Sequence, residues 1–141
     1  MGEVVSSRFG KIKFREKEII SFSKGIIGFS DKKNYVLLEL EEYKPFKWLH
    51  SIDDANLAFV LIDPFVFFSG YLIKPGPEDL TELEENDLKE LKIYVIVTLS
   101  SDPSQTSANL IAPLIFNFKR NLGKQIVLLK SPYSTRHFLL K

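Results

Sequence analysis

The sequence predicts a mainly β protein: an antiparallel, closed or nearly closed small barrel with one short helical insert at about residues 77–91. Short runs rich in Val, Ile, Phe and Tyr recur along the chain, separated by turn-forming Gly, Pro, Asn and Asp residues. Leucine recurs at helical spacing in one acidic stretch. We expect nine or ten short strands, and closing them into a barrel removes exposed sheet edges.

The first strands are expected between residues 11 and 40. Residues 11–14 alternate basic with apolar side chains, which predicts a strand with its apolar face on the core. Further strands are expected at residues 19–22 and 35–40. Gly25 and Gly28 bracket two isoleucines, and this spacing indicates bends or a positive φ rather than a phosphate-binding loop.

The middle of the chain predicts a hairpin followed by more strand. Residues 47–52 and 57–62 are its two strands, and residues 53–56 (DDAN) supply the turn. We expect residues 65–68 and 70–73 to extend the sheet after an Asp-Pro pair, because proline favours a strand start or an edge.

The helical insert is expected to begin at the Gly-Pro-Glu-Asp sequence of residues 76–79. Leu83 and Leu88 are five residues apart, so one bent helix and two short helices both fit the pattern. Residues 94–99 form a nearly continuous apolar run, which predicts a strand buried on both faces. The last strands are expected at residues 114–117, 122–125 and 126–129.

The length of 141 residues fits a single β domain over residues 1–141, and a domain of this size buries about 70% of the surface of its unfolded chain. The absence of cysteine excludes thiol nucleophiles, zinc ribbons and redox switches. The N-terminus lacks the charged start and long apolar stretch of a signal peptide, so we expect a protein that is neither secreted nor membrane-spanning. The absence of cysteine fits a cytoplasmic protein in a reducing environment.

The charge is balanced overall but uneven along the chain. The net charge is +1, yet residues 78–90 carry seven acids against one lysine, while residues 119–141 carry four lysines and two arginines with no acid. This bipolar pattern is more typical of a protein-binding module than of a nucleic-acid binder.

The residues supply no convincing catalytic set, so we do not expect an enzyme, a cofactor or a small-molecule substrate. A small hydrolase acting through Asp53, Asp63 and His50 is one alternative, but aspartates at turns or before proline usually make local hydrogen bonds. His50 and Ser51 are strand neighbours and point to opposite faces. His50 and His137 have no metal-ligand spacing, so no metal site is expected.

A nucleic-acid-binding β-barrel module is the second alternative. Phe65, Phe67 and Phe68 resemble a base-stacking platform, but no Lys or Arg lies between residues 49 and 73 to accompany them. The basic C-terminal stretch is spread over more than twenty residues and includes apolar ones. We therefore expect no direct nucleic-acid binding.

An ordered set of motifs over nearly the whole chain resembles the flagellar assembly factor FliW family. The motifs are residues 9–12 (FGKI), 20–29 (ISFSKGIIGF), 45–51 (PFKWLHS), 58–65 (AFVLIDPF), 108–113 (ANLIAP), 122–125 (LGKQ) and 133–137 (YSTRH). Two positions depart from the family pattern: His50 stands where Gln is expected, and Ser107 where Thr is common. If the Gln position contacts a partner, a histidine makes that contact weaker or pH-sensitive.

The resemblance implies a bacterial protein that binds and antagonises the translational regulator CsrA and binds flagellin, coupling flagellin synthesis to flagellum assembly. Trp48 fits two roles: a tryptophan is more often a core residue, but indole is also a common interface anchor. The candidate partner-binding residues are Trp48, His50, Asp53, Asn109, Tyr133 and Arg136. In a complex with CsrA, the acidic side chains of Glu82, Glu84 and Glu85 are expected to repel RNA.

Overall fold

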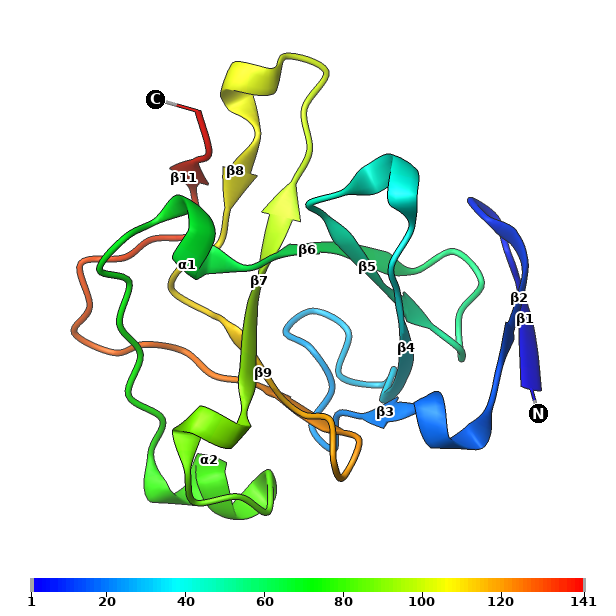
Figure 1. Ribbon diagram of the computed structural model, residues 1–141, viewed down its shortest axis with the longest axis horizontal. Helices are drawn as coiled ribbons and strands as arrows, with labels where there is room; N and C mark the ends of the chain where they lie inside the picture. The colour runs from blue at the N-terminus through cyan, green and yellow to red at the C-terminus, as the bar shows by residue number, and fades with distance from the viewer. Residues whose placement is uncertain (1, 141) are drawn as a thin grey trace.

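The computed structural model describes residues 2–140, and its centre is a closed β-barrel of seven strands (Figure 1). The predicted barrel is therefore confirmed. No helix in the described part of the chain is long and apolar enough to cross a membrane. The barrel strands are β3 (Ile20–Ser21), β4 (Asn34–Leu38), β5 (Lys47–Ser51), β6 (Ala58–Ile62), β7 (Lys92–Thr98), β9 (Leu114–Asn117) and β10 (Leu122–Gln125).

The barrel closes because β7 pairs with β6 on one side and with β9 on the other. The strand order around the wall is β7-β6-β5-β4-β3-β10-β9. β3 and β10 run parallel, whereas the other pairs in this wall are antiparallel. A closed ring with an odd number of strands cannot alternate direction throughout, so at least one neighbouring pair must be parallel. The expectation of a fully antiparallel barrel was wrong for this one pair.

The barrel interior is filled by large side chains. Leu49 and Leu61 from the predicted hairpin are fully buried there, together with Phe22, Tyr35 and Phe116. The loop between β3 and β4 also inserts Ile26. Gly25 permits this fold of the loop: its φ is 67°, and a Cβ there would lie 2.6 Å from the Ser30 backbone.

A two-stranded hairpin covers part of the outer barrel surface. It consists of β1 (Gly2–Ser6) and β2 (Gly10–Phe14). Ile12 and Phe14 are buried against Val36 of β4, as the alternation of residues 11–14 predicts. The partner strand β1 was not expected.

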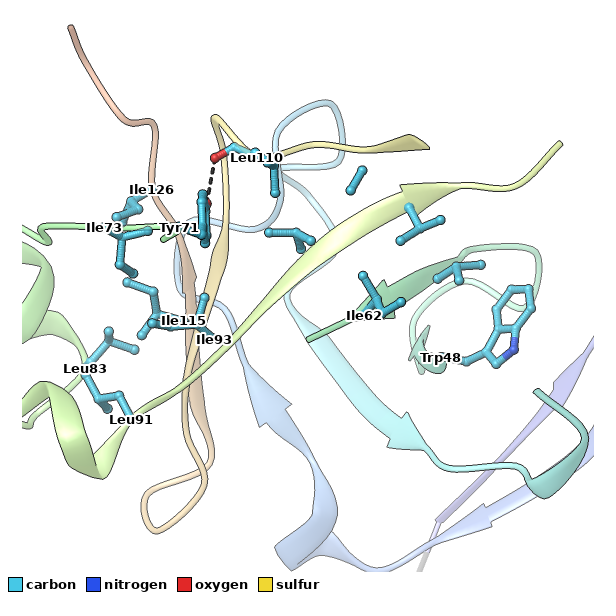
Figure 2. Packing of buried hydrophobic residues seen from close by; sticks show 14 residues of the cluster. Trp48, Ile62, Tyr71, Ile73, Leu83, Leu91, Ile93, Leu110, Ile115 and Ile126 are labelled. Atoms are coloured by element: carbon cyan, nitrogen blue, oxygen red, sulfur yellow. Dashed lines mark hydrogen bonds between the residues drawn. The ribbon is translucent and has the colours of Figure 1, made fainter. Parts of the chain in front are cut away.

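A larger apolar cluster covers the outer surface of the wall from Trp48, beside the hairpin, to Leu83 and Leu91 at the acidic insert, and Figure 2 shows its packing. Ile93, Val95 and Val97 point outward from β7 into this cluster while Tyr94 points inward, so the strand is buried on both faces as predicted. Tyr71 lies in the cluster and donates a 2.6 Å hydrogen bond to the Leu110 carbonyl (Figure 2). Burial of this phenol raises its pKa.

The helices are short. α1 (Pro64–Phe67) replaces the strand expected at residues 65–68, because Asp63 caps the helix by accepting the Phe65 N–H at 2.9 Å. The acidic insert forms two pieces, α2 (Pro77–Glu82) and the 3-10 helix η3 (Leu88–Glu90). The other 3-10 helices in residues 2–140 are η1 (Glu16–Glu18), η2 (Glu41–Tyr43) and η4 (Pro103–Gln105).

β7 continues beyond the barrel into a small sheet, which we call the β7–β8–β11 extension. β8 (Ser107–Ala108) pairs with the end of β7, and β11 (His137–Phe138) pairs with β8 (Figure 1). The expected strands at residues 70–73 and 126–129 do not form. Gly70 lies in a turn with a φ of 81°. The N–H of Leu72 donates to the Tyr133 hydroxyl instead of a neighbouring strand.

Candidate functional site

His50 lies under the β1–β2 hairpin, with 1% of its surface exposed. Its Nδ1 lies 2.7 Å from the Ser51 carbonyl oxygen, which can only accept, so Nδ1 carries the proton. Nε2 then accepts from the Ser6 hydroxyl at 2.7 Å. The same hydroxyl oxygen accepts the N–H groups of Arg8 and Phe9, both at 3.1 Å. His50 therefore fixes the turn of the hairpin to the barrel wall.

Trp48 lies beside this network and is also buried. Its ring meets Phe9 and Tyr43 edge-on, at centroid distances of 5.1 and 5.4 Å. The Arg8 guanidinium lies 5.0 Å from the indole centroid. The indole N–H has no hydrogen-bond partner among the described residues. Both Trp48 and His50 are almost fully buried, although His50 also borders a surface pocket beside Ser6 and Arg8.

Asp53 and Asp63 lie at opposite ends of β6. Asp53 belongs to the β5–β6 turn and accepts the N–H of Asn34 at 3.3 Å, while Asp63 caps α1 and pairs with Lys92 at 3.0 Å. The five residues of β6 separate them, about 16 Å at the rise of an extended strand. With His50 held by Ser6, these three side chains do not converge on one site.

Asp53 also influences the barrel interior. Burial, together with the negative charge of Asp53, raises the pKa of Tyr35 to about 12. The Tyr35 hydroxyl therefore stays protonated at neutral pH and donates to the Lys32 carbonyl at 3.1 Å.

Asn109 and Arg136 come together in a polar groove on one face of the β7–β8–β11 extension. Arg136 donates to the Gln105 side-chain oxygen at 3.3 Å, and its guanidinium lies 5.1 Å from the Phe138 ring centroid. The Asn109 side-chain oxygen accepts the Ala112 N–H at 3.1 Å. The groove has a volume of about 510 Å³ and is lined by Ile96, Thr98, Leu99, Ser100, Gln105, Ser107, Asn109, Thr135 and Arg136.

An apolar groove lies beside it, meeting the polar groove at Leu99 and Ser100. Leu99 and Leu140 are 47% and 56% exposed, which leaves large apolar side chains in contact with water. The groove has a volume of about 300 Å³ and is lined by Pro45, Phe46, Phe67, Leu99, Ser100, Pro103, Thr106, Leu139 and Leu140.

Tyr133 anchors the chain that leads into β11. Its hydroxyl accepts the Leu72 N–H at 3.1 Å, and its ring lies 4.7 Å from the Tyr71 ring, centroid to centroid. The Ser134 carbonyl accepts the N–H groups of Leu110 and Ile111. These contacts position Arg136 over the polar groove.

The two charge blocks of the sequence meet in the fold. Lys124 lies 2.7 Å from Asp79 and also pairs with Glu82, which in turn lies 2.9 Å from Lys24. Burial raises the pKa of Asp79, but the hydrogen bonds from Lys124 and from the Gly76 N–H outweigh it and hold that pKa below its ordinary value.

The same pairing extends along the acidic insert. Glu90 pairs with Lys119 at 3.0 Å, and Glu84 lies 4.0 Å from Arg120. Glu85 forms no ion pair within residues 2–140, and its carboxylate accepts the Asp87 N–H. The field of the acidic insert is therefore partly neutralised by the chain itself.

Within residues 2–140, no three His, Cys, Asp or Glu side chains gather to hold a metal ion. The architecture is that of a small closed β-barrel with a projecting sheet that carries two grooves. The model of the family described as FliW protein matches residues 3–139. The chain belongs to the FliW family.

Individual relatives agree with this assignment. A flagellar assembly factor FliW of Clostridium botulinum is 42% identical over 137 residues, covering 97% of each chain. The Natranaerobius thermophilus flagellar assembly factor FliW is 46% identical over 139 residues, covering 96% of this chain and 90% of the relative. A crystal structure of the flagellar assembly factor FliW superposes with a TM-score of 0.93 at 38% identity, covering 99% and 98% of the two chains.

Proposed function

We propose that this protein binds and antagonises CsrA and binds flagellin, in the cytoplasm, and so couples flagellin synthesis to flagellum assembly. The observation that carries the proposal is the match to flagellar assembly factors over nearly the whole chain, at 42% and 46% identity. The surfaces available to partners fit a binding role, because both grooves are open and lined by side chains without competing internal ion pairs.

Among the candidate contact residues, Asn109 and Arg136 are the two that line the polar groove, where a partner can contact both. Tyr133 anchors the chain segment that leads to Arg136 by accepting the Leu72 N–H. Trp48 and His50 act indirectly in this proposal: they hold the hairpin in place. Asp53 lies at the exposed hairpin turn, apart from the polar groove.

The direct test is isothermal titration of the purified protein with purified CsrA and, separately, with flagellin monomers. Saturable binding of each is expected. Arg136→Glu is expected to weaken one of the two complexes, whereas Lys11→Glu, which makes the same charge change on the distant face of β2, is expected to leave both intact. Absence of binding to both proteins contradicts the proposal.

We further propose that the acidic insert repels RNA in the CsrA complex. Of Glu82, Glu84 and Glu85, only Glu85 forms no ion pair within residues 2–140. Repulsion between exposed charges decays over a Debye length of about 8 Å at physiological ionic strength. Changing Glu82, Glu84 and Glu85 to Gln is expected to slow RNA displacement from CsrA at low salt and to have less effect at high salt. If the wild-type protein and the triple variant bind CsrA equally and displace RNA equally at low salt, the acidic insert does not repel RNA.

The single change Glu85→Gln serves as the matched control for stability, because it breaks no internal ion pair. Glu82→Gln, by contrast, removes a partner of Lys24 and Lys124. If only variants that include Glu82→Gln impair displacement, the cause is loosening of α2 rather than lost repulsion.

A further inference from the structure

β11 is the outermost strand of the large sheet and has an open edge. It pairs with β8 on one side, and no strand pairs with its other side within residues 2–140. Edge strands carry a row of unpaired N–H and C=O groups that another chain can pair with. Proteins use such edges to bind extended peptides by adding them as a further strand.

The register identifies which backbone groups face outward. The Leu139 N–H donates to the Thr106 carbonyl at 3.1 Å, and the Asn109 N–H donates to the Ile96 carbonyl at 2.9 Å. Phe138 lies opposite Ser107, and hydrogen-bonded and non-bonded pairs alternate along antiparallel strands. The N–H and C=O of Phe138 therefore point away from β8, toward the open edge.

The two grooves border this edge. Side chains of an added strand alternate between the two faces of the sheet. On one face they meet the apolar groove at Leu139 and Leu140; on the other they meet Arg136 and the exposed ring of Phe138. The edge therefore selects for a peptide with two different faces.

Arg136 favours a peptide that carries a negative charge. Within residues 2–140 no carboxylate pairs with its guanidinium, whose contacts are the neutral side chains of Gln105 and Phe138. An incoming carboxylate can accept from the guanidinium without displacing an internal acid, and charge-assisted hydrogen bonds of this kind are the stronger ones.

We propose that the open edge of β11 binds an extended segment of a partner protein as an added strand, with apolar residues facing the apolar groove and an acidic residue facing Arg136. The backbone of Phe138 supplies the hydrogen bonds. This surface shares Arg136 with the polar groove of the proposed function, but its peptide test uses neither CsrA nor flagellin, so the two proposals can fail separately.

The test uses a blocked synthetic peptide in which valine alternates with glutamate, added to the ¹⁵N-labelled full-length protein. Slower hydrogen exchange of the Phe138 and Leu140 amides is expected, with shift changes confined to the two grooves and β11. A peptide of the same composition with its valines and glutamates in separate blocks is expected to bind less. Binding that leaves these amides unprotected overturns the proposal.

Substitutions at the edge separate backbone from side-chain effects. Phe138→Pro removes the outward N–H but none of the bonds to β8, because proline is tolerated at an open strand edge. Phe138→Ala removes the same ring and keeps the N–H. The proline variant is expected to bind about tenfold more weakly than the alanine variant, near the upper end for one hydrogen bond. Equal binding by the two variants contradicts strand addition.

Two further measurements remain decisive if Phe138→Pro does not fold. The wild-type protein is titrated with two versions of the same peptide, each carrying N-methyl groups on one of the two alternating sets of amides. The version methylated on the amides that face β11 is expected not to bind. Arg136→Glu is expected to reverse the preference, so that a valine–lysine peptide binds better than the valine–glutamate peptide. Unchanged affinity in both measurements overturns the proposal.

Discussion

Gly123 lies in β10 with its backbone directly against the ring of Phe22 in the barrel interior. A Cβ at position 123 would lie 2.4 Å from the ring Cζ and 2.5 Å from Cε1, about 1 Å inside the normal carbon–carbon contact of roughly 3.5–4.0 Å. The ring cannot easily move, because it is fully buried between Tyr35 and Phe116 at centroid distances of 5.4 and 5.6 Å. Gly123→Ala is therefore expected to cost about 1–3 kcal/mol of stability, the usual cost of overpacking.

The partner substitution tests whether that contact is the cause. Phe22→Leu removes the ring atoms that overlap, at a cost of its own of about 1–3 kcal/mol. In the double variant the new methyl group enters the vacated space, so the combined loss is expected to fall short of the sum by at least about 0.5 kcal/mol. Urea unfolding of the four proteins, followed by circular dichroism, measures the free energies. Additive losses refute the steric explanation.

Lys124→Met is expected to lower stability at pH 7 by about 1–3 kcal/mol, since it leaves two partly buried carboxylates without their shared cation. The pKa of Asp79 lies below its ordinary 3.8 in the folded protein, so its contribution is present above pH 3.8 and lost as the pH falls through the folded value. The deficit of the variant, measured by urea unfolding across pH, should shrink below about pH 4; a constant deficit argues against the ion pair. Ser6→Ala is expected to cost about 1–3 kcal/mol, because it removes the hydroxyl that serves His50 and two backbone N–H groups; thermal unfolding that matches wild type contradicts this. Tyr133→Phe leaves one backbone N–H without its acceptor, so faster exchange of that amide is expected, and unchanged exchange contradicts the anchor.

Much of the barrel could be predicted because its strands carry their own signals. The hairpin of β5 and β6 combines two apolar runs with the turn at residues 53–56, where Ser51 accepts the N–H groups of Asp53 and Asp54 at 3.0 Å. β7 was recognised by its continuous apolar run, and its burial on both faces follows from the barrel inside and the apolar cluster outside.

The error at α1 has a local cause. A short apolar run such as residues 65–68 fits a strand and a helical turn equally well. The deciding signal is the pair before it: Asp63 supplies an N-cap and Pro64 occupies the first helical position.

The arrangement of the candidate site residues could not be predicted, because it is set by contacts between residues far apart in the sequence. Ser6 and His50 are 44 positions apart, so the burial of His50 could not be read from its strand. The acidic and basic blocks appeared as opposite poles, yet Lys124 and Glu82 pair across 42 positions. Asn109 and Arg136 belong to two motifs that are far apart in the sequence, and only the β7–β8–β11 extension places them in one groove.

The measurement that tests the proposed function most directly is fluorescence anisotropy of a labelled CsrA target RNA bound to CsrA, titrated with this protein. The proposal predicts that the anisotropy falls toward that of free RNA as the protein is added. It also predicts no rise in anisotropy when the protein meets the RNA without CsrA. If the CsrA–RNA complex persists at saturating protein, CsrA antagonism is wrong for this chain.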